Sequence, residues 1–308
     1  MLLLIPDSEL PQPESRSQMS RRILLVVLAA AVMVLLTACV FEFDNAGSMV
    51  AGALKEYSET VEMSDKYKTG QPLELNLDMD MAKAVMDSTD ESLVDVKFSY
   101  SSKALKPELK VDEDEISIRN RLEGYSFGKV VNNWDVKVTD KLPLEVEVKA
   151  DASDIRLDMS RMQVNSIDAE LNASSARMYF NEQNKVPADK FKLNADASSA
   201  DIYGAGNLGF DVMDIDADAS KLVIDLTGFN EKDGEVRIDA NASSVKLRLP
   251  EDADIRIVID NYEISSININ NDRILRSSEK EYISKNYGNA VRSLEINADL
   301  NITSLTIE

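Results

Sequence analysis

The stretch NADASSADIYG, residues 194–204, recurs in altered form through the second half of the chain. Four further copies share its design, an Ala-Ser pair with alternating apolar and polar residues on both sides. The pairs begin 21, 24, 22 and 23 residues apart, at Ala152, Ala173, Ala197, Ala219 and Ala242. A repeat of about 22 residues is typical of a solenoid, in which each unit packs only on its neighbours.

The residues around each pair indicate strands with one buried face. In one copy, every second residue before the pair is apolar: Val236, Ile238, Ala240 and Ala242. After the pair the alternation resumes at Val245, one residue out of phase. In a straight strand such a slip would move the apolar side chains to the opposite face of the sheet, so the chain is expected to bend there. We therefore predict that each Ala-Ser pair forms a corner, where bulk would clash with the corner of the next unit.

The prediction is an all-β fold, a parallel β-solenoid with roughly six rungs of about 22 residues and an N-terminal β-strand cap. The sixth copy has Ile302-Thr303 at the corner. Neighbouring rungs, about 4.8 Å apart, favour opposite charges side by side. Aligning the copies gives such an outward-facing column: Glu147, Asp168, Lys192, Asp214, Arg237 and Glu295. Asp225 is likewise expected beside Arg248, although Asp216 would then face Asp239.

The composition changes along the chain and suggests five regions. They are a signal peptide at 1–38, a lipidated N-terminus and tether at 39–70, an N-terminal β region at 71–145, the solenoid repeats at 146–250, and a C-terminal insert with the final rung at 251–308. Met19 is a better start for a signal peptide than Met1, so residues 1–18 are interpreted as an upstream extension.

The N-terminal segment predicts a lipid anchor. Arg21 and Arg22 precede an apolar run at 23–36. That run suits a signal peptide better than a spanning helix, which needs about 20 apolar residues. The run leads into residues 36–39, Leu-Thr-Ala-Cys, which resemble a bacterial lipobox. The resemblance implies lipidation of Cys39 and an extracytoplasmic location at the cell membrane or cell surface. An uncleaved transmembrane helix running to Phe43 is the alternative.

Composition excludes several function classes. The chain of 308 residues has a formal net charge of −21, which argues against binding nucleic acid. It contains no His, so a Ser/His/Asp triad is impossible. Its single Cys excludes an intrachain disulfide and a thiolate metal cluster. No cofactor is expected, and the prediction is a protein that is not an enzyme.

The chain resembles the bacterial toast-rack or LiaF-like β-solenoids, a group of adhesin-like and envelope-stress proteins. The resemblance lies in residues 132–178, NNWDVKVTDKLPLEVEVKADASDIRLDMSRMQVNSIDAELNASSARM, and in the ending at 286–308, NYGNAVRSLEINADLNITSLTIE. It implies a β-solenoid from about residue 60 onward. Two features differ: relatives commonly have Gly-rich corners, and LiaF-type regulators carry several membrane helices where this chain has a lipobox.

Two sets of residues are candidate ligand sites. Asp214, Asp216 and Asp218 form an acidic strip, and calcium prefers such carboxylate oxygens. The alternative is that acidic residues simply keep the outer face soluble. Tyr179 and Tyr203 fall on successive rungs and are candidates for binding a sugar ring. Stacking of the two rings on each other is the alternative.

Three function hypotheses follow. The first is a non-enzymatic, membrane-anchored envelope lipoprotein that presents an acidic surface for binding or adhesion, with an envelope protein or cell-wall glycan as partner. The second is an envelope-stress accessory that regulates a membrane sensor. The third is a polysaccharide-active enzyme, which would need a carboxylate pair in a cleft.

Overall fold

The computed structural model describes residues 54–64, 66–67, 71–122, 130–228, 232–262, 264–285 and 287–308. These residues belong to one compact unit, Ala46–Glu308. Within them the chain forms 23 strands and two short 3-10 helices, η1 (Lys103–Leu105) and η2 (Ala205–Leu208). The predicted signal peptide and Cys39 lie outside the described residues.

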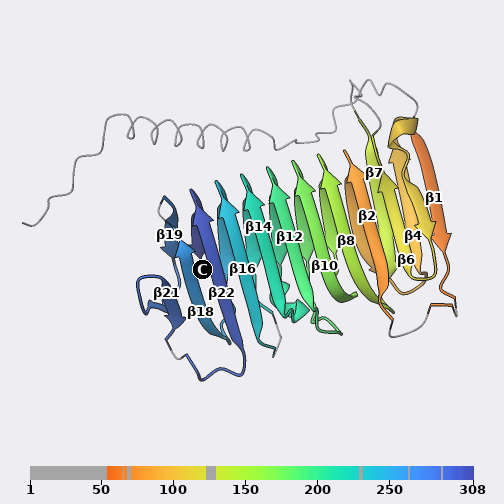
Figure 1. Cartoon of the computed structure of the whole chain (residues 1–308). Coiled ribbons are helices and arrows are strands. Elements are labelled where there is room, and N and C mark those ends of the chain that lie inside the picture. Colours follow the sequence, from red (N-terminus) through yellow and green to blue (C-terminus); the bar gives the residue numbers. More distant parts are fainter. Residues whose placement is uncertain are drawn as a thin grey trace, which may run out of the picture. The chain divides into compact units, whose positions relative to one another are not determined.

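The strands form two long sheets (Figure 1). Sheet A has 11 strands in the order β1 (Lys55–Val61), β4 (Val94–Tyr100), β7 (Asn132–Thr139), β3 (Lys83–Thr89), β9 (Asp154–Asp158), β11 (Ser175–Tyr179), β13 (Ser199–Tyr203), β15 (Lys221–Asp225), β17 (Ser244–Arg248), β23 (Ser304–Ile307) and β19 (Ser266–Ile269).

Sheet B has 12 strands. Their order is β20 (Ile274–Arg276), β21 (Glu281–Ser284), β18 (Asp254–Asn261), β22 (Ser293–Asn301), β16 (Gly234–Asn241), β14 (Val212–Asp218), β12 (Lys190–Asp196), β10 (Gln163–Asn172), β8 (Pro143–Asp151), β2 (Leu73–Asp80), β6 (Glu115–Asn120) and β5 (Glu108–Val111).

Each repeat contributes one strand to each sheet, so the predicted parallel β-solenoid is confirmed. The rung β12–β13, for example, pairs in parallel with β10–β11 on one side and with β14–β15 on the other. Along β12, Phe191, Leu193 and Ala195 are buried, while the residues between them are partly exposed. The apolar side chains of both sheets thus fill one continuous core between the sheets.

The region at 71–145 contains further rungs that the repeat pattern did not reveal. Strands β2 and β3 pair in parallel with β8 and β9, and β6 and β7 continue the stack beyond them. The corner between β2 and β3 is Met81-Ala82 instead of Ala-Ser, so the Ala-Ser repeat did not reveal this rung. Antiparallel strands β1, β4 and β5 close this end.

The tether expected at 39–70 is wrong for part of its length. Lys55–Val61 forms β1, which pairs antiparallel with β4 over seven residues. Tyr57 of β1 stacks on Phe98 of β4, with ring centroids 6.0 Å apart. Polar residues on the outer side of an edge strand are compatible with pairing, so a polar composition did not exclude a strand here.

The C-terminal region changes the order in which the rungs stack. Strands β18 and β19, from the insert, form a regular rung at the end of the solenoid. The last rung in sequence, β22–β23, lies between this rung and β16–β17. The insert at 251–292 therefore closes this end with a rung of its own, followed by the antiparallel strands β21 and β20.

The corners have a different physical basis from the one expected. Ala152, Ala173, Ala197, Ala219 and Ala242 have φ between 49° and 52° and are exposed or partly exposed, not buried against the next rung. Met81 and Ile302 occupy the same position with φ of 51° and 52°, so bulk is accepted there. The position requires a left-handed backbone, and the buried residue of each pair is the serine.

The serines form a ladder through the corners. The backbone N–H of each donates to the hydroxyl of the serine on the next rung, in the order Ser153, Ser174, Ser198, Ser220 and Ser243, at 3.0 Å in every case. Thr303 continues the ladder, accepting from the Ser243 N–H at 3.4 Å. Each hydroxyl satisfies a buried N–H group that the bend removes from the sheet ladder. The hydroxyl explains why serine, and not merely a small residue, repeats.

Replacing Ala219 with glycine is expected to stabilise the protein by about 0.5 kcal/mol. A left-handed backbone costs a non-glycine residue about 1–2 kcal/mol, while glycine loses about 0.5–1 kcal/mol more chain entropy on folding. The Ala219 side chain is partly exposed, so little packing is lost. Urea denaturation tests this, with Ala217→Gly, a buried strand position, as the control expected to destabilise. A destabilised Ala219→Gly variant would contradict the strain argument.

Candidate functional site

The outer face of sheet B carries the predicted charge column. Asp168 neighbours Glu147 and Lys192, and Lys192 neighbours Asp214, which in turn neighbours Arg237. The Lys192 ammonium lies 3.6 Å from the Asp168 carboxylate. These positions confirm the register predicted from the repeats.

The prediction is wrong for one member of the column, Glu295. Arg237 neighbours Asn297, and Glu295 lies beside Glu235. Counting back from the corner at Ile302 gives Asn297, so the final copy had been aligned two residues out of register. On sheet A, the expected pair of Asp225 and Arg248 is confirmed at 3.2 Å.

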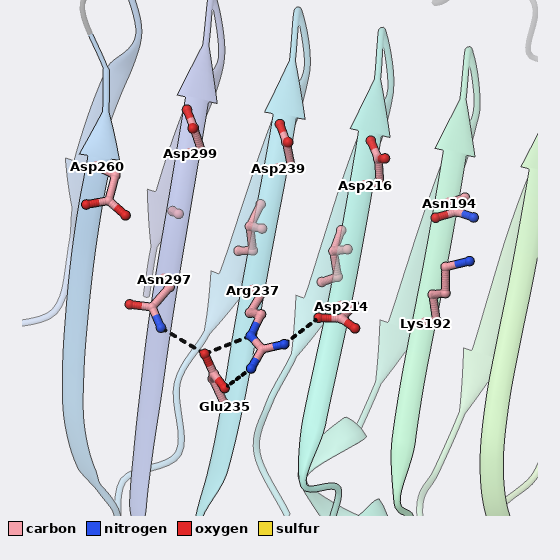
Figure 2. A pocket seen from close by; sticks show the side chains of 13 residues that line it. Lys192, Asn194, Asp214, Asp216, Glu235, Arg237, Asp239, Asp260, Asn297 and Asp299 are labelled. Carbon is pink, nitrogen blue, oxygen red and sulfur yellow. Dashed lines mark hydrogen bonds and ion pairs between the residues drawn. The ribbon is translucent and has the colours of Figure 1, made fainter.

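A shallow hollow of about 450 Å³ lies on this outer face, over strands β12, β14, β16, β22 and β18 (Figure 2). Its lining combines cations, amides and acids. The polar residues are Lys192, Asn194, Asp214, Asp216, Glu235, Arg237, Asp239, Asp260, Asn297 and Asp299. All of them lie at outward positions of their strands, which the alternation of side chains dictates.

One half of the hollow is internally neutralised. Arg237 binds both Glu235 oxygens, at 2.8 Å and 2.5 Å, and its guanidinium lies 3.7 Å from Asp214 (Figure 2). Asn297 donates to Glu235 at 3.1 Å. The hydrogen bond from Arg237 lowers the pKa of Glu235, and the same contact raises the pKa of Arg237. The charged side chains of this half neutralise one another, so no bound ligand is needed to balance their charge.

The other half is a row of carboxylates without a cation. Asp216, Asp239 and Asp299 lie side by side on β14, β16 and β22, and Asp260 lies on the next strand, β18, off the line of these three (Figure 2). Among the described residues no hydrogen bond or ion pair to the first three carboxylates is found. Burial, and then the charges of Asp216, Asp299 and Asp218, raise the pKa of Asp239.

The raised pKa of Asp239 has a defined consequence for stability. A carboxyl whose pKa rises on folding binds its proton more tightly in the folded state. Its contribution to stability is therefore present at acid pH and lost as the pH rises through the folded-state pKa. At neutral pH the row lowers the stability of the folded state, because like charges directly opposite on neighbouring strands repel.

The acidic strip predicted on β14 does not form a metal-binding arrangement. Asp214, Asp216 and Asp218 alternate along one strand, and Asp214 is already bound by Lys190 at 3.0 Å and by Arg237. In the ranges that the structure covers, no group of three or more acidic, His or Cys side chains is placed to hold a metal ion. Of the strip, Asp216 alone belongs to the carboxylate row.

Tyr179 and Tyr203 stack on one another on the outer face of sheet A. Their ring centroids are 5.0 Å apart and their planes differ by 11°. The guanidinium of Arg156 lies over the Tyr179 ring, 4.9 Å from its centroid. Burial and then the charge of Asp201 raise the pKa of Tyr203. Tyr179 is thus covered on both faces, an arrangement that favours cross-strand stacking over sugar binding.

Sequence reasoning missed Asp299 as a member of the carboxylate row. The repeat alignment predicts the pairing of Asp216 with Asp239, and the structure confirms it. The same alignment, counted back from the Ile302 corner, places Asp299 beside Asp239, as the structure shows. The signal was therefore present in the sequence as a run of like charges in one column.

The lipidation candidate, Cys39, lies outside the described residues, as does the apolar run before it. In the part of the chain covered by the structure, no helix has the length and apolar character needed to cross a membrane.

A family model described as the N-terminal domain of toast_rack, DUF2154, matches residues 50–203. No curated protein matches the sequence. Among solved structures, a candidate cell adhesion protein from Clostridium sporogenes is 19% identical, with 83% of this chain and 99% of that chain covered and a TM-score of 0.45. A candidate adhesin from Bacteroides fragilis is 9% identical, with coverages of 85% and 100% and a TM-score of 0.42. A candidate lipid-binding protein from Parabacteroides distasonis is 8% identical, with coverages of 83% and 97% and a TM-score of 0.32. The family match spans half of the chain, and with the stacked two-sheet fold it shows that this chain belongs to the toast-rack family.

Proposed function

We propose that this chain is a non-enzymatic, lipid-anchored protein of the bacterial cell envelope that binds a cationic partner on the outer face of sheet B. The anchor is Cys39, held to the membrane by the acyl chains that its lipobox-like surroundings imply. The binding surface is the hollow across β12, β14, β16, β22 and β18. The partner is a basic segment of another envelope protein or an amino-bearing glycan.

The carboxylate row carries this proposal. Elsewhere on the outer faces, some neighbouring rungs place opposite charges together, as Lys192 and Asp168 do, and others place like charges side by side, as Glu235 and Glu295 do. Asp216, Asp239 and Asp299 are like charges on three consecutive strands inside the hollow, and among the described residues their carboxylates have no hydrogen-bond or ion-pair partner. Residues that break a local rule at a cost to stability are expected at functional sites. A cation seated on the row would relieve the repulsion.

Chemistry of the chain favours binding over catalysis. It has no His to serve as a general base near neutral pH. Asp216, Asp239 and Asp299 lie on an open strand face, whereas glycoside hydrolysis needs a pair of carboxyl groups in a substrate cleft. Membership of the toast-rack family and the stacked fold are consistent with a surface protein of this kind.

A labelled oligolysine peptide, followed by fluorescence anisotropy, tests the surface. The variant Asp216→Asn/Asp239→Asn/Asp299→Asn is expected to bind about tenfold more weakly, since three exposed ion pairs are worth about 0.5 kcal/mol each. The same variant is expected to be more stable at neutral pH, because its row no longer repels itself. Wild-type binding should weaken as salt is added.

The matched control removes the same charge from the same face outside the hollow. Glu145→Gln/Glu147→Gln/Glu170→Gln changes three carboxylates on β8 and β10. This variant is expected to keep nearly all of the affinity. An equal loss in both variants would show that oligolysine responds to net charge only, and the proposal of a local surface would fail.

A further inference from the structure

The two sheets end in four edge strands, and one of them carries no charged side chain. Exposed edges are normally blunted by charged residues, which discourage pairing with another chain. Three of the edges carry charges: β1 has Lys55 and Glu56, β5 has Glu108 and Lys110, and β20 has Arg276. The fourth edge, β19, reads Ser-Ile-Asn-Ile and has none.

The backbone of β19 is half unpaired. On its inner side, the Ser266 N–H donates to the carbonyl of Thr303, just before β23, at 2.9 Å, and the Asn270 N–H donates to the carbonyl of Ile307 in β23 at 2.7 Å. In a parallel ladder alternate residues turn their backbone groups to opposite sides. Ile267 and Ile269 therefore direct their N–H and C=O groups to the open side of the sheet. Among the described residues no strand pairs with them there.

Sheet B extends beyond this edge and sheet A does not. Strands β18 and β19 form the last rung, and sheet B then adds β21 and β20. Sheet A stops at β19, so an added strand on its edge would lie opposite the overhanging pair. The side chains of Ile267, Ile269 and Tyr282 are only partly buried at this end of the core. One added strand would extend the core between the sheets. A second copy of the solenoid would instead place its own β20 and β21 where β20 and β21 of the first copy already lie.

We propose that β19 is an acceptor edge for one extended, uncharged peptide segment of a partner protein with alternating apolar and polar residues. The segment adds in parallel to sheet A, as β23 adds to β17. In that pair the Ser304 N–H donates to Ser243 and the Glu308 N–H donates to Leu247. The inserted strand donates in the same way to the carbonyls of Ile267 and Ile269. This surface is separate from the carboxylate row and does not depend on it.

A peptide copying residues 301–307 with both ends capped, which contains β23 and carries no charge, serves as the probe. At about 1 mM, enough to occupy roughly half of a site of millimolar affinity, it is expected to slow amide hydrogen exchange at Ile267 and Ile269. Two N-methylated isomers of the peptide test which of its edges donates to β19. N-methylation at the positions of Ser304 and Thr306 removes the donating edge and is expected to weaken binding about tenfold, through two lost hydrogen bonds. N-methylation at the positions of Leu305 and Ile307 is expected to leave binding in place.

Two protein variants give the complementary result. Ile267→Pro removes an N–H on the open side while leaving the bonds to β23, so peptide affinity should fall. Ile267→Val keeps the backbone group and should bind like the wild type. Equal binding of both methylated isomers, or no protection by the unmethylated peptide, would overturn the proposal. Both of these outcomes are measured on the wild-type chain, so a folding defect in a variant cannot produce either of them.

Discussion

Replacing Ser198 with alanine is expected to lower the free energy of unfolding by about 2 kcal/mol. The Ser198 hydroxyl accepts the N–H of Ser174 at 3.0 Å and lies within hydrogen-bond distance of the Leu171 and Asp196 carbonyls, at 2.9 Å and 2.8 Å. Ser198 is 5% exposed. Water cannot replace the lost partner at a buried corner, so the Ser174 N–H is left unsatisfied.

Urea denaturation measures this loss, and the neighbouring serine supplies the control. Ser199 is only partly buried, and its single hydroxyl contact, to Ser175, is long at 3.4 Å. Ser199→Ala is therefore expected to change stability by less than about 0.5 kcal/mol. If both variants lose the same amount, the ladder contributes no more than any exposed hydroxyl. A loss restricted to Ser198 would show that the corners are held by the stacked serines.

Replacing Cys39 with alanine is expected to abolish incorporation of labelled palmitate and to release the protein from membranes. The acyl chain attaches through the thiol, and Cys39 is the only cysteine in the chain. Each buried CH₂ group contributes about 0.8 kcal/mol of membrane affinity, so loss of two or three chains removes nearly all of it.

Lipid labelling with phase partitioning in detergent checks the anchor. Ala38→Gly keeps a small residue before the cysteine and is expected to retain the label. Incorporation that survives Cys39→Ala would contradict the lipobox interpretation. Retention in the membrane without any label would point instead to an uncleaved helix that begins near Ile23.

Much of the fold followed from the sequence because a solenoid is a local architecture. Each rung contacts only its neighbours, so a short repeat with fixed spacing contains both the strand direction and the register. The alternation through Val236, Ile238 and Ala240 predicted buried positions correctly. The neighbours of Lys192 and Asp214 were also predicted correctly, since stacked copies place equivalent residues side by side.

The candidate site could be predicted only in part. The repeat placed Asp216 beside Asp239, but a list of charges does not show which of them are neutralised. Asp214 is bound by Lys190 and Arg237, whereas Asp216 has no such partner among the described residues. That difference depends on the reach of particular side chains across the sheet.

By itself the sequence determined the repeat and the parallel stacking of its rungs, and it predicts a lipid anchor at the lipobox-like segment ending in Cys39. The tertiary structure alone decided the order of the terminal rungs, because β22–β23 lies between strands that precede it in the chain. It also decided which residue of each corner is buried, since the left-handed backbone at Ala152 and its equivalents turns the alanine outward and the serine inward. Neither result is contained in a period of two or of 22: the order of the terminal rungs depends on pairing between distant strands, and the orientation of each corner depends on its backbone conformation.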